Sequence, residues 1–201
     1  MTSQVEIANT ALERLGARPI SSFSDGSKAA RLASSAYDRV RLEVLRAHPW
    51  NCISARALLA ESTEPPAFGY AHQYPLPADC ERVLEVGDSD STDFESRYSW
   101  VVEGRMILTD EGAPLPVRYL KDDTDPQKYD STLVSAIAER LAFELCEPIT
   151  QSNTKKQAHW DAYQALLRTA KSSDGQEQST MQASEDQWIL ARQGGSWSDR
   201  Y

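Results

Sequence analysis

The sequence predicts an α+β fold: a four-helix bundle with an inserted antiparallel β meander and an extended C-terminal tail. Near both ends of residues 1–171, apolar residues recur every three or four positions, which is the spacing of one face of an α-helix. Between these segments, prolines and glycines separate short runs of strand-forming residues. The expected division is therefore residues 1–49 and 122–171 for the helical bundle, 50–121 for a β-rich insert, and 172–201 for a C-terminal linker and docking tail.

Two helices are expected before the β-rich insert. Ser3 and Glu6 fit a capping box, and Gly16 supplies a C-terminal stop. Between them lies an apolar stripe formed by Val5, Ala8, Leu12 and Leu15. The second helix is expected over residues 27–47, with an apolar face formed by Ala33, Ala36, Tyr37, Val40 and Val44. The charged residues of this helix are expected to lie mostly away from that face: Arg31, Asp38, Arg41 and Glu43.

The end of the second helix is marked by His48, Pro49 and Trp50, which form a predicted junction between the bundle and the sheet. Pro49 ends the helix because the residue before a proline is pushed out of helical geometry. We expect Trp50 to be a core residue that seals this junction, with Phe68 or Tyr70 as packing partners; a direct interface role is the alternative. We expect His48 to be a helix-end residue near the negative end of the helix dipole, rather than a catalytic base.

Six runs in the β-rich insert have strand-like composition: CISARALLA, AHQYPL, RVLEV, WVVEG, RMILTD and PVRYLK. Glu103 and Gly104 predict a tight hairpin between two of these runs. Pro75 and Pro77 suit an edge strand or a loop, because proline cannot donate a ladder hydrogen bond. The pattern of the first run also fits a short helix.

Two further helices are expected after the insert. Asp125 and Pro126 predict a cap followed by proline in the first helical turn. The apolar stripe of this helix, which ends near Pro148, is Val134, Ala138, Leu141 and Leu145. The last helix is expected over about residues 153–171, with one face formed by Trp160, Tyr163, Leu167 and Ala170.

Acidic residues are concentrated in the middle of the chain. Residues 61–130 contain 16 acidic and 6 basic residues, a net charge of −10, whereas the remainder, with 14 acidic and 15 basic residues, carries +1. A surface of this sign repels phosphate, so non-specific nucleic-acid binding is disfavoured. Candidates for an acidic surface are Asp88, Asp90, Asp93, Glu95, Asp122 and Asp123. Residues 88–95 lack the glycine and distal glutamate of a calcium loop, so a solvated hairpin tip is expected, with an incidental cation site as the alternative.

No motif in the sequence assigns a catalytic site, a cofactor or a metal. His48, His72 and His159 do not have the spacing of metal ligands. The three cysteines are far apart and form no CxxC motif, which indicates reduced thiols. Cys80 is expected to be a small core residue at the start of a strand, with a nucleophile as the alternative. No segment approaches the roughly 20 apolar residues of a membrane span, and the N-terminus lacks the pattern of a secretion signal.

The C-terminal tail combines a polar linker with clustered aromatic residues. Residues 172–187 have the composition of a disordered linker. The candidate docking residues that follow are Trp188, Ile189, Leu190, Trp197 and Tyr201. Buried aromatic side chains are common anchors of protein interfaces. We therefore expect the tail to bind another subunit or partner; packing on its own core and disorder are the alternatives.

Ordered similarity over about residues 3–171 resembles the head-to-tail adaptors of short-tailed phages, the tail tubular protein A family, and their prophage relatives. Its most specific elements are HPWN at residues 48–51, YPLPADC at 74–80 and DPQKYDSTLVSAIAERLAFEL at 125–145. The resemblance implies a helical bundle with a β-rich part, and no enzymatic activity. It also implies a ring, commonly of twelve subunits, seated in the virion between the portal protein and a tail nozzle of the tail tubular protein B type. DNA would pass through such a ring without specific binding.

Several alternatives remain open from the sequence. Within phage assembly, the chain could be another neck or head-completion (stopper) protein. Outside it, a small hydrolase would require converging His, Asp or Cys side chains in a polar pocket. A small soluble binding module would instead be a monomer or dimer with an ordered ligand groove.

Overall fold

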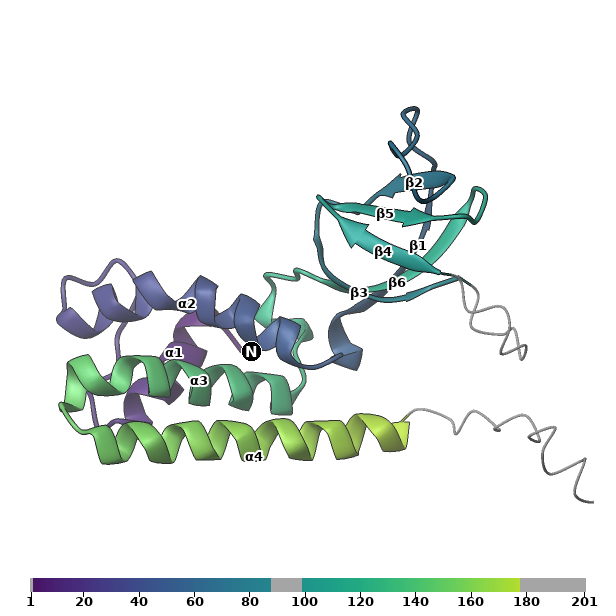
Figure 1. Cartoon of the computed structure of the whole chain (residues 1–201). Coiled ribbons are helices and arrows are strands. Elements are labelled where there is room, and N and C mark those ends of the chain that lie inside the picture. Colours follow the sequence, from purple (N-terminus) through teal and green to yellow (C-terminus); the bar gives the residue numbers. More distant parts are fainter. Residues whose placement is uncertain (1, 88–98, 178–201) are drawn as a thin grey trace, which may run out of the picture.

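A computed structural model of the chain describes residues 2–87 and 99–177. Over these residues the fold is mixed α+β, with four α-helices and two three-stranded antiparallel sheets. Figure 1 shows that the helices lie side by side in one part of the molecule, and that the sheets stand beyond the C-terminal end of α2. The α+β class expected from the sequence is therefore confirmed.

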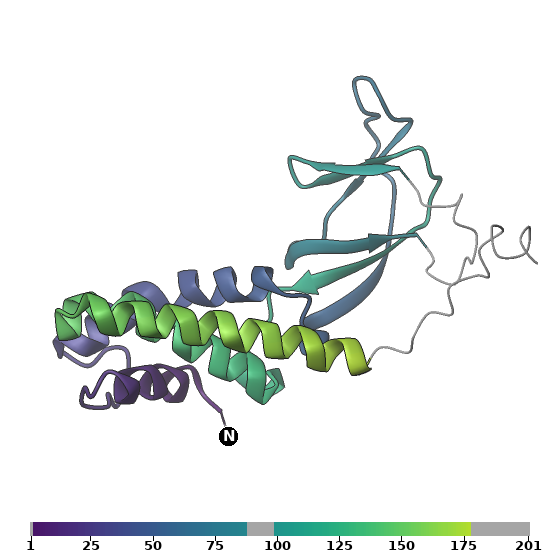
Figure 2. The same cartoon turned by 60° about the horizontal axis from the view of Figure 1, so that its bottom comes forward.

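The helical part consists of α1 (Gln4–Arg14), α2 (Lys28–Ala47), α3 (Ser131–Thr150) and α4 (Asn153–Glu177). Helix α3 packs against each of the other three helices, whereas α1 and α2 touch each other only slightly. Figure 2 shows α4 running along the length of this part, with its C-terminal end on the side of the sheets. The central position of α3 agrees with its apolar composition, because a helix surrounded on several sides has little surface left for charged residues.

Local signals in the sequence account for the starts of the helices. The expected capping box is present in α1: the Ser3 hydroxyl accepts from the Glu6 amide, and the Glu6 carboxylate accepts from the Ser3 amide. Ser27 caps α2, and the expected apolar face of α2 is buried. Gly16 follows α1 with a φ of 72°, in the left-handed region that glycine adopts most easily.

Helix α3 begins later than the sequence predicts. The side chain of Asp125 accepts from the Gln127 amide, but it caps only the short 3₁₀ helix η3 (Pro126–Lys128). Tyr129 is extended, and Asp130 then caps α3 by accepting from the Leu133 amide at 2.7 Å. Two caps in close succession therefore split the predicted helix. At the other end, α4 extends beyond the expected residue 171 to Glu177.

The described strands are β1 (Ser54–Leu59), β2 (His72–Pro75), β3 (Cys80–Val86), β4 (Trp100–Glu103), β5 (Met106–Thr109) and β6 (Leu115–Lys121). A short 3₁₀ helix, η1 (Asn51–Ile53), comes directly before β1. The strands form a first sheet in the order β1-β6-β3 and a second sheet in the order β2-β5-β4. All pairs are antiparallel. The order is not that of a single meander, because only β4 and β5 pair with a strand that is next to them in the described sequence.

The predicted hairpin between β4 and β5 is present, with its turn one residue later than expected. Gly104 and Arg105 occupy the two turn positions, with φ angles of 52° and 67°. Positive φ at both positions is the conformation that matches the twist of two-residue hairpins. The Arg105 guanidinium donates to the carbonyl oxygens of Pro77 at 2.7 Å and Ala78 at 3.2 Å, which ties the turn to the segment before β3.

Two hydrophobic cores meet at β6. The core between the two sheets contains Tyr74, Ile107, Val117 and Tyr119, together with neighbouring apolar residues. Leu120 belongs instead to the core of the helical part. Successive side chains of a strand point to opposite faces, so Tyr119 and Leu120 enter different cores from adjacent positions. The first sheet is thus shared between the β part and the helical part.

Among the helices in the described residues, none is both long enough and apolar enough to cross a membrane.

Candidate functional site: the junction and the open face of the first sheet

The junction, defined here as residues 48–50, lies where α2 leads into β1, with His48 and Trp50 buried and Pro49 half-buried. Trp50 is completely buried, and its indole N–H donates to the carbonyl oxygen of Val44 at 2.9 Å. Carbonyl groups in the last turn of a helix lack donors from a following turn, so this bond satisfies one of them. His48 is buried as well, and its ring lies edge-on to that of Trp50 with centroids 4.8 Å apart.

Trp50 belongs to the core of the helical part, as the junction hypothesis expected of a core residue. The expected partner Phe68 is wrong: it lies in the loop between β1 and β2 and is 87% exposed. That loop leads into the second sheet, whereas Trp50 packs on the helical side of the first sheet. At the junction, Trp50 therefore fills space in the core and donates a hydrogen bond to a backbone carbonyl at the end of α2, and His48 lies in the interior.

Charged side chains connect the helices to the first sheet beside the junction. Arg41, which the periodicity of α2 placed away from the apolar face, is in fact 3% exposed. Its guanidinium pairs with the carboxylate of Asp122 at 2.5 Å, just after β6. Burial alone would lower the pKa of Arg41, but hydrogen bonds to Asp122 and Tyr129 outweigh it and raise that pKa. Arg46 also reaches across to β3, where it donates to the carbonyl oxygen of Glu81.

Asp122 and Asp123 do not form the open acidic surface that the sequence suggested. Asp122 is paired with Arg41, and Asp123 accepts from Lys128 at 2.8 Å. Burial would raise the pKa of Asp123, but the hydrogen bonds from Lys128 and from the Asp125 amide outweigh it and lower that pKa. The other acidic candidates, Asp88, Asp90, Asp93 and Glu95, lie outside the described residues. So do the tail candidates Trp188, Ile189, Leu190, Trp197 and Tyr201.

A buried carboxylate links three helices in the helical part. Glu139 of α3 is 6% exposed and lies 2.5 Å from Arg14 of α1 and 2.5 Å from the Nδ1 atom of His159 of α4. Buried charges are normally paired in this way, since an isolated one is costly to desolvate. No group of three or more His, Cys, Asp or Glu side chains suited to a metal ion occurs in residues 2–87 and 99–177.

The cysteine thiols are buried or half-buried. Cys80 starts β3 and is 4% exposed, as expected of a core residue. Burial raises the pKa of Cys80 and raises that of Cys52 to about 12. Because the thiolate is the reactive form, both side chains are poor nucleophiles at neutral pH.

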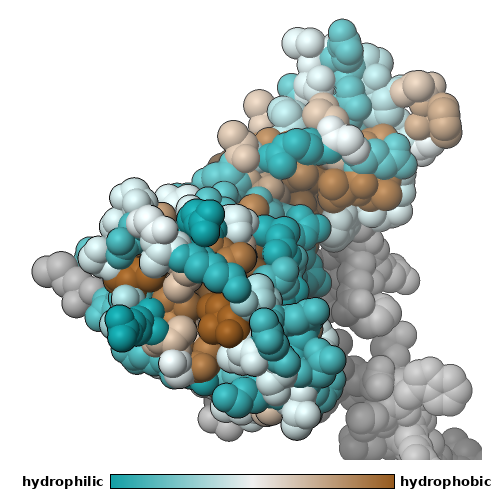
Figure 3. Space-filling model, turned by 90° about the vertical axis from the view of Figure 1, so that its left-hand side faces the viewer, coloured by the Kyte–Doolittle hydropathy of each residue, from teal (hydrophilic) through white to brown (hydrophobic). Residues whose placement is uncertain are grey.

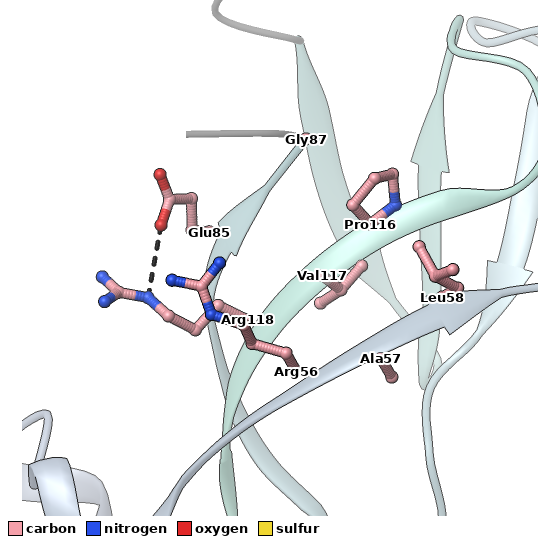
Figure 4. A pocket seen from close by; sticks show the side chains of 8 residues that line it. All are labelled: Arg56, Ala57, Leu58, Glu85, Gly87, Pro116, Val117 and Arg118. Atoms are coloured by element: carbon pink, nitrogen blue, oxygen red, sulfur yellow. Dashed lines mark ion pairs between the residues drawn. The ribbon is translucent and has the colours of Figure 1, made fainter. Parts of the chain in front are cut away.

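The outer face of the first sheet carries a shallow cavity of about 300 Å³ (Figure 4). Arg56 of β1 lies directly opposite Arg118 of β6 in the strand register. The Nε atom of Arg118 is 3.2 Å from the carboxylate of Glu85 on β3. Beside these charges lie the apolar side chains of Leu58 and Pro116, and Leu58 is 70% exposed. The cavity therefore combines apolar side chains with two guanidinium groups.

A second exposed feature is the end of the helical part farthest from the sheets. Figure 3 shows apolar residues grouped among polar ones at this end. Lys28, at the start of α2, donates to the carbonyl oxygen of Pro148 near the end of α3 at 2.7 Å, so these two elements meet there. Their partly buried apolar residues are Ala29, Leu32 and Ile149.

Sequence reasoning anticipated the junction but missed the cavity and the two buried charge clusters. The alternation of side chains in β1 and β6 can be read from the sequence, and it places Arg56 and Arg118 each on the face opposite the core between the sheets. Their proximity depends on the pairing of β1 with β6, two strands separated by four others along the described chain.

In comparisons with known proteins, no family model matches the chain and no curated protein matches it.

Proposed function

We propose that this chain is a structural virion protein: a head-to-tail adaptor that forms a ring between the portal protein and the tail nozzle of a short-tailed phage. The ring would contain twelve copies, as the resemblance implies, and would provide a platform for tail assembly. DNA would pass through its channel without specific binding. The protein would be made in the host cytoplasm and reside in the virion neck. The proposal assigns it no enzymatic activity and no cofactor.

The observation that carries the proposal is where the family-like segments lie in the fold. Residues 48–51 form the junction between α2 and β1. Residues 74–80 connect β2 of the second sheet with β3 of the first. Residues 125–145 contain η3 and most of α3, the helix on which the other three pack. Likeness at these positions is what a shared scaffold would produce, since they fix how the helices and the sheets are joined.

Within this proposal the four helices act as one bundle, residues 50–121 act as its β-rich insert, and residues 172–201 act as the docking tail. The partly buried ion pair between Arg41 and Asp122 supports a fixed placement of the insert on the bundle, because it joins α2 to the end of β6. A fixed placement is useful to a ring subunit, whose neighbours on both sides must meet it at constant angles.

A mass measurement of the purified protein, alone and mixed with the matching portal protein, tests the proposal. We expect the chain to join the portal in a closed ring of about twelve copies, visible by native mass spectrometry and by negative-stain microscopy along the ring axis. A closed ring with a different number of copies on the portal would correct the expected copy number and leave the adaptor role unchanged.

A mixture that contains free portal and a monomeric or dimeric chain at micromolar concentrations would contradict the proposal. A chain that binds only after another protein has occupied the portal would favour the stopper alternative, because a stopper acts elsewhere in the neck. A portal from an unrelated phage is the control for non-specific association.

A further inference from the structure

The cavity lies on the face of the first sheet that points away from the core between the sheets, and the core of the helical part meets this face beyond the cavity, at Leu120. In β1, Ala55, Ala57 and Leu59 belong to the core between the sheets, and the alternating positions Arg56 and Leu58 point the other way. Figure 4 shows the side chains of Arg56 and Arg118 on the same side of the sheet, at one end of the cavity. Leu58, which is 70% exposed, lies beside these two arginines and gives the cavity an apolar side chain next to its charged groups.

Strand β1 is also an edge of its sheet. It pairs with β6 on one side and with no other strand in the described part of the chain. The backbone groups along its other side are therefore available to an added strand, which is a common way for a sheet to bind an extended segment. The exposed edge and the cavity are adjacent, so one segment could occupy both.

The charge of the cavity indicates an acidic occupant. Two arginines lie opposite each other at the Arg56–Arg118 register position, and like charges facing across a strand pair are destabilising. Glu85 accounts for one of them. Arg56 makes no ion pair or hydrogen bond with another described residue, so its positive charge has no counter-charge within residues 2–87 and 99–177.

The tail of the chain contains a segment with the matching chemistry. Residues 185–190 read Glu-Asp-Gln-Trp-Ile-Leu: two carboxylates followed by three large apolar residues. The carboxylates match the arginine cluster, and the apolar residues match Leu58 and Pro116 beside it. Glu185 lies eight residue steps after Glu177, the end of α4, a span of up to about 26 Å in an extended chain.

We propose that residues 185–190 of one copy bind the edge of β1 and the cavity of a neighbouring copy. This inference rests on the proposed function, since it gives the docking tail a receptor on the adjacent subunit of the ring. A tail and a receptor on different surfaces of the same chain form a heterologous contact, which is the kind of contact that generates rings.

Photo-crosslinking of the full-length protein tests the inference. A photo-reactive phenylalanine analogue replaces Leu58, and equal amounts of unlabelled and ¹⁵N-labelled copies are mixed and irradiated, with and without portal protein. We expect covalent dimers in which the crosslink joins the peptide around residue 58 of one isotope form to residues 183–192 of the other. The same analogue at Lys155, an exposed position on α4, is the control.

Charge reversal supplies the second arm. We expect Arg56→Glu to reduce the crosslink about tenfold, as removal of one well-formed charged contact would. Adding Glu185→Arg and Asp186→Arg to the same chain should restore it, whereas Arg31→Glu, the same charge change on an exposed residue of α2, should have no effect. Circular dichroism confirms that each variant is folded.

The outcomes separate this inference from the proposed function. A ring on the portal without the mixed-isotope crosslink overturns the inference and leaves the adaptor proposal standing. Crosslinks within a single copy, or to a segment other than 183–192, overturn it as well. Mixed-isotope crosslinks in concentrated protein that forms no ring with portal would support the receptor and contradict the adaptor.

Discussion

At residue 50 a tryptophan side chain is completely buried at the point where α2 ends and the chain turns into β1. It contributes in two separable ways: its rings fill space in the core of the helical part, and its indole N–H bonds to the carbonyl oxygen of Val44. Pro49 turns the backbone just before it, because the residue preceding a proline avoids helical geometry. The turn and the anchor thus sit in adjacent residues.

The two contributions of Trp50 predict two different losses of stability. Trp50→Ala should lower the free energy of unfolding by about 3–5 kcal/mol, the range for removing a large buried aromatic side chain. Trp50→Phe keeps most of the apolar volume and loses the hydrogen bond, so we expect a loss of about 1–3 kcal/mol. Urea unfolding followed by circular dichroism at 222 nm measures both. Leu58→Ala, at an exposed position, should change the value by less than about 0.5 kcal/mol.

If Trp50→Phe and Trp50→Ala both unfolded at the same urea concentration as the unaltered protein, the anchoring role of residue 50 would be wrong. The phenylalanine variant keeps this test informative even if the alanine variant does not fold.

At the scale of elements, helices α2 and α3 are joined by a closed set of four charged side chains. Arg39 contacts Glu43 at 3.0 Å and Glu144 at 2.6 Å, and Arg140 contacts Glu43 at 2.6 Å and Glu144 at 3.1 Å. Each charge therefore has two partners, one on its own helix and one on the other. Networks of this kind contribute more than isolated surface pairs do.

This network predicts a stability difference that depends on pH. Burial would raise the pKa of Glu144, but hydrogen bonds from Arg39 and Arg140 outweigh it and hold that pKa below its ordinary value of 4.5. A carboxyl group whose pKa is lowered on folding stabilises the protein above its unfolded-state pKa, and this contribution disappears as the pH falls through the folded-state pKa. Glu144→Gln should therefore lower the free energy of unfolding by about 1 kcal/mol at pH 6, and the difference should shrink steadily below pH 4.5.

Urea unfolding of both proteins at a series of pH values measures this difference. Glu13→Gln, which changes an exposed glutamate of α1, is the matched control and should give no pH-dependent difference. A Glu144→Gln deficit that persisted unchanged at pH 3 would show that the ionised carboxylate is not its source.

The elements differ in how far their sequence predicts them. Apolar spacing and caps predict α1 and α2 closely, because both signals are local to the helix. They misplace the start of α3, where Asp125 and Asp130 both act as caps and the buried, extended Tyr129 lies between them. The polar position of Arg41 also fails, since its partner Asp122 is far away in sequence. Apart from the β4–β5 hairpin, strand order depends on such distant pairings, so composition predicts the strands but not the two sheets.

At the scale of the whole molecule, the two hydrophobic cores are joined through the first sheet, and the long helix α4 lies at the edge of this arrangement. Helix α4 contacts α3 and continues to Glu177, toward the side on which the sheets stand (Figure 2). Both cores consist of residues within 2–177. The proposed docking residues lie after α4, so the proposal assigns docking to a different part of the chain from the described residues that form both cores.

This separation predicts that assembly can be lost while the fold is kept. A chain that ends after Glu177 keeps every described residue of both cores, so we expect it to unfold within about 0.5 kcal/mol of the full-length protein. It should nevertheless fail to form the ring with portal protein, as measured by native mass spectrometry and sedimentation.

Trp188→Ala and Trp197→Ala together should weaken assembly in the same direction, because aromatic side chains carry a large share of interface energy. A full-length chain with Ser179→Ala is the matched control for altering the tail without removing an anchor. Normal ring formation by the truncated chain would assign portal attachment to the described surfaces, and the end of the helical part seen in Figure 3 would then be the surface to mutate next.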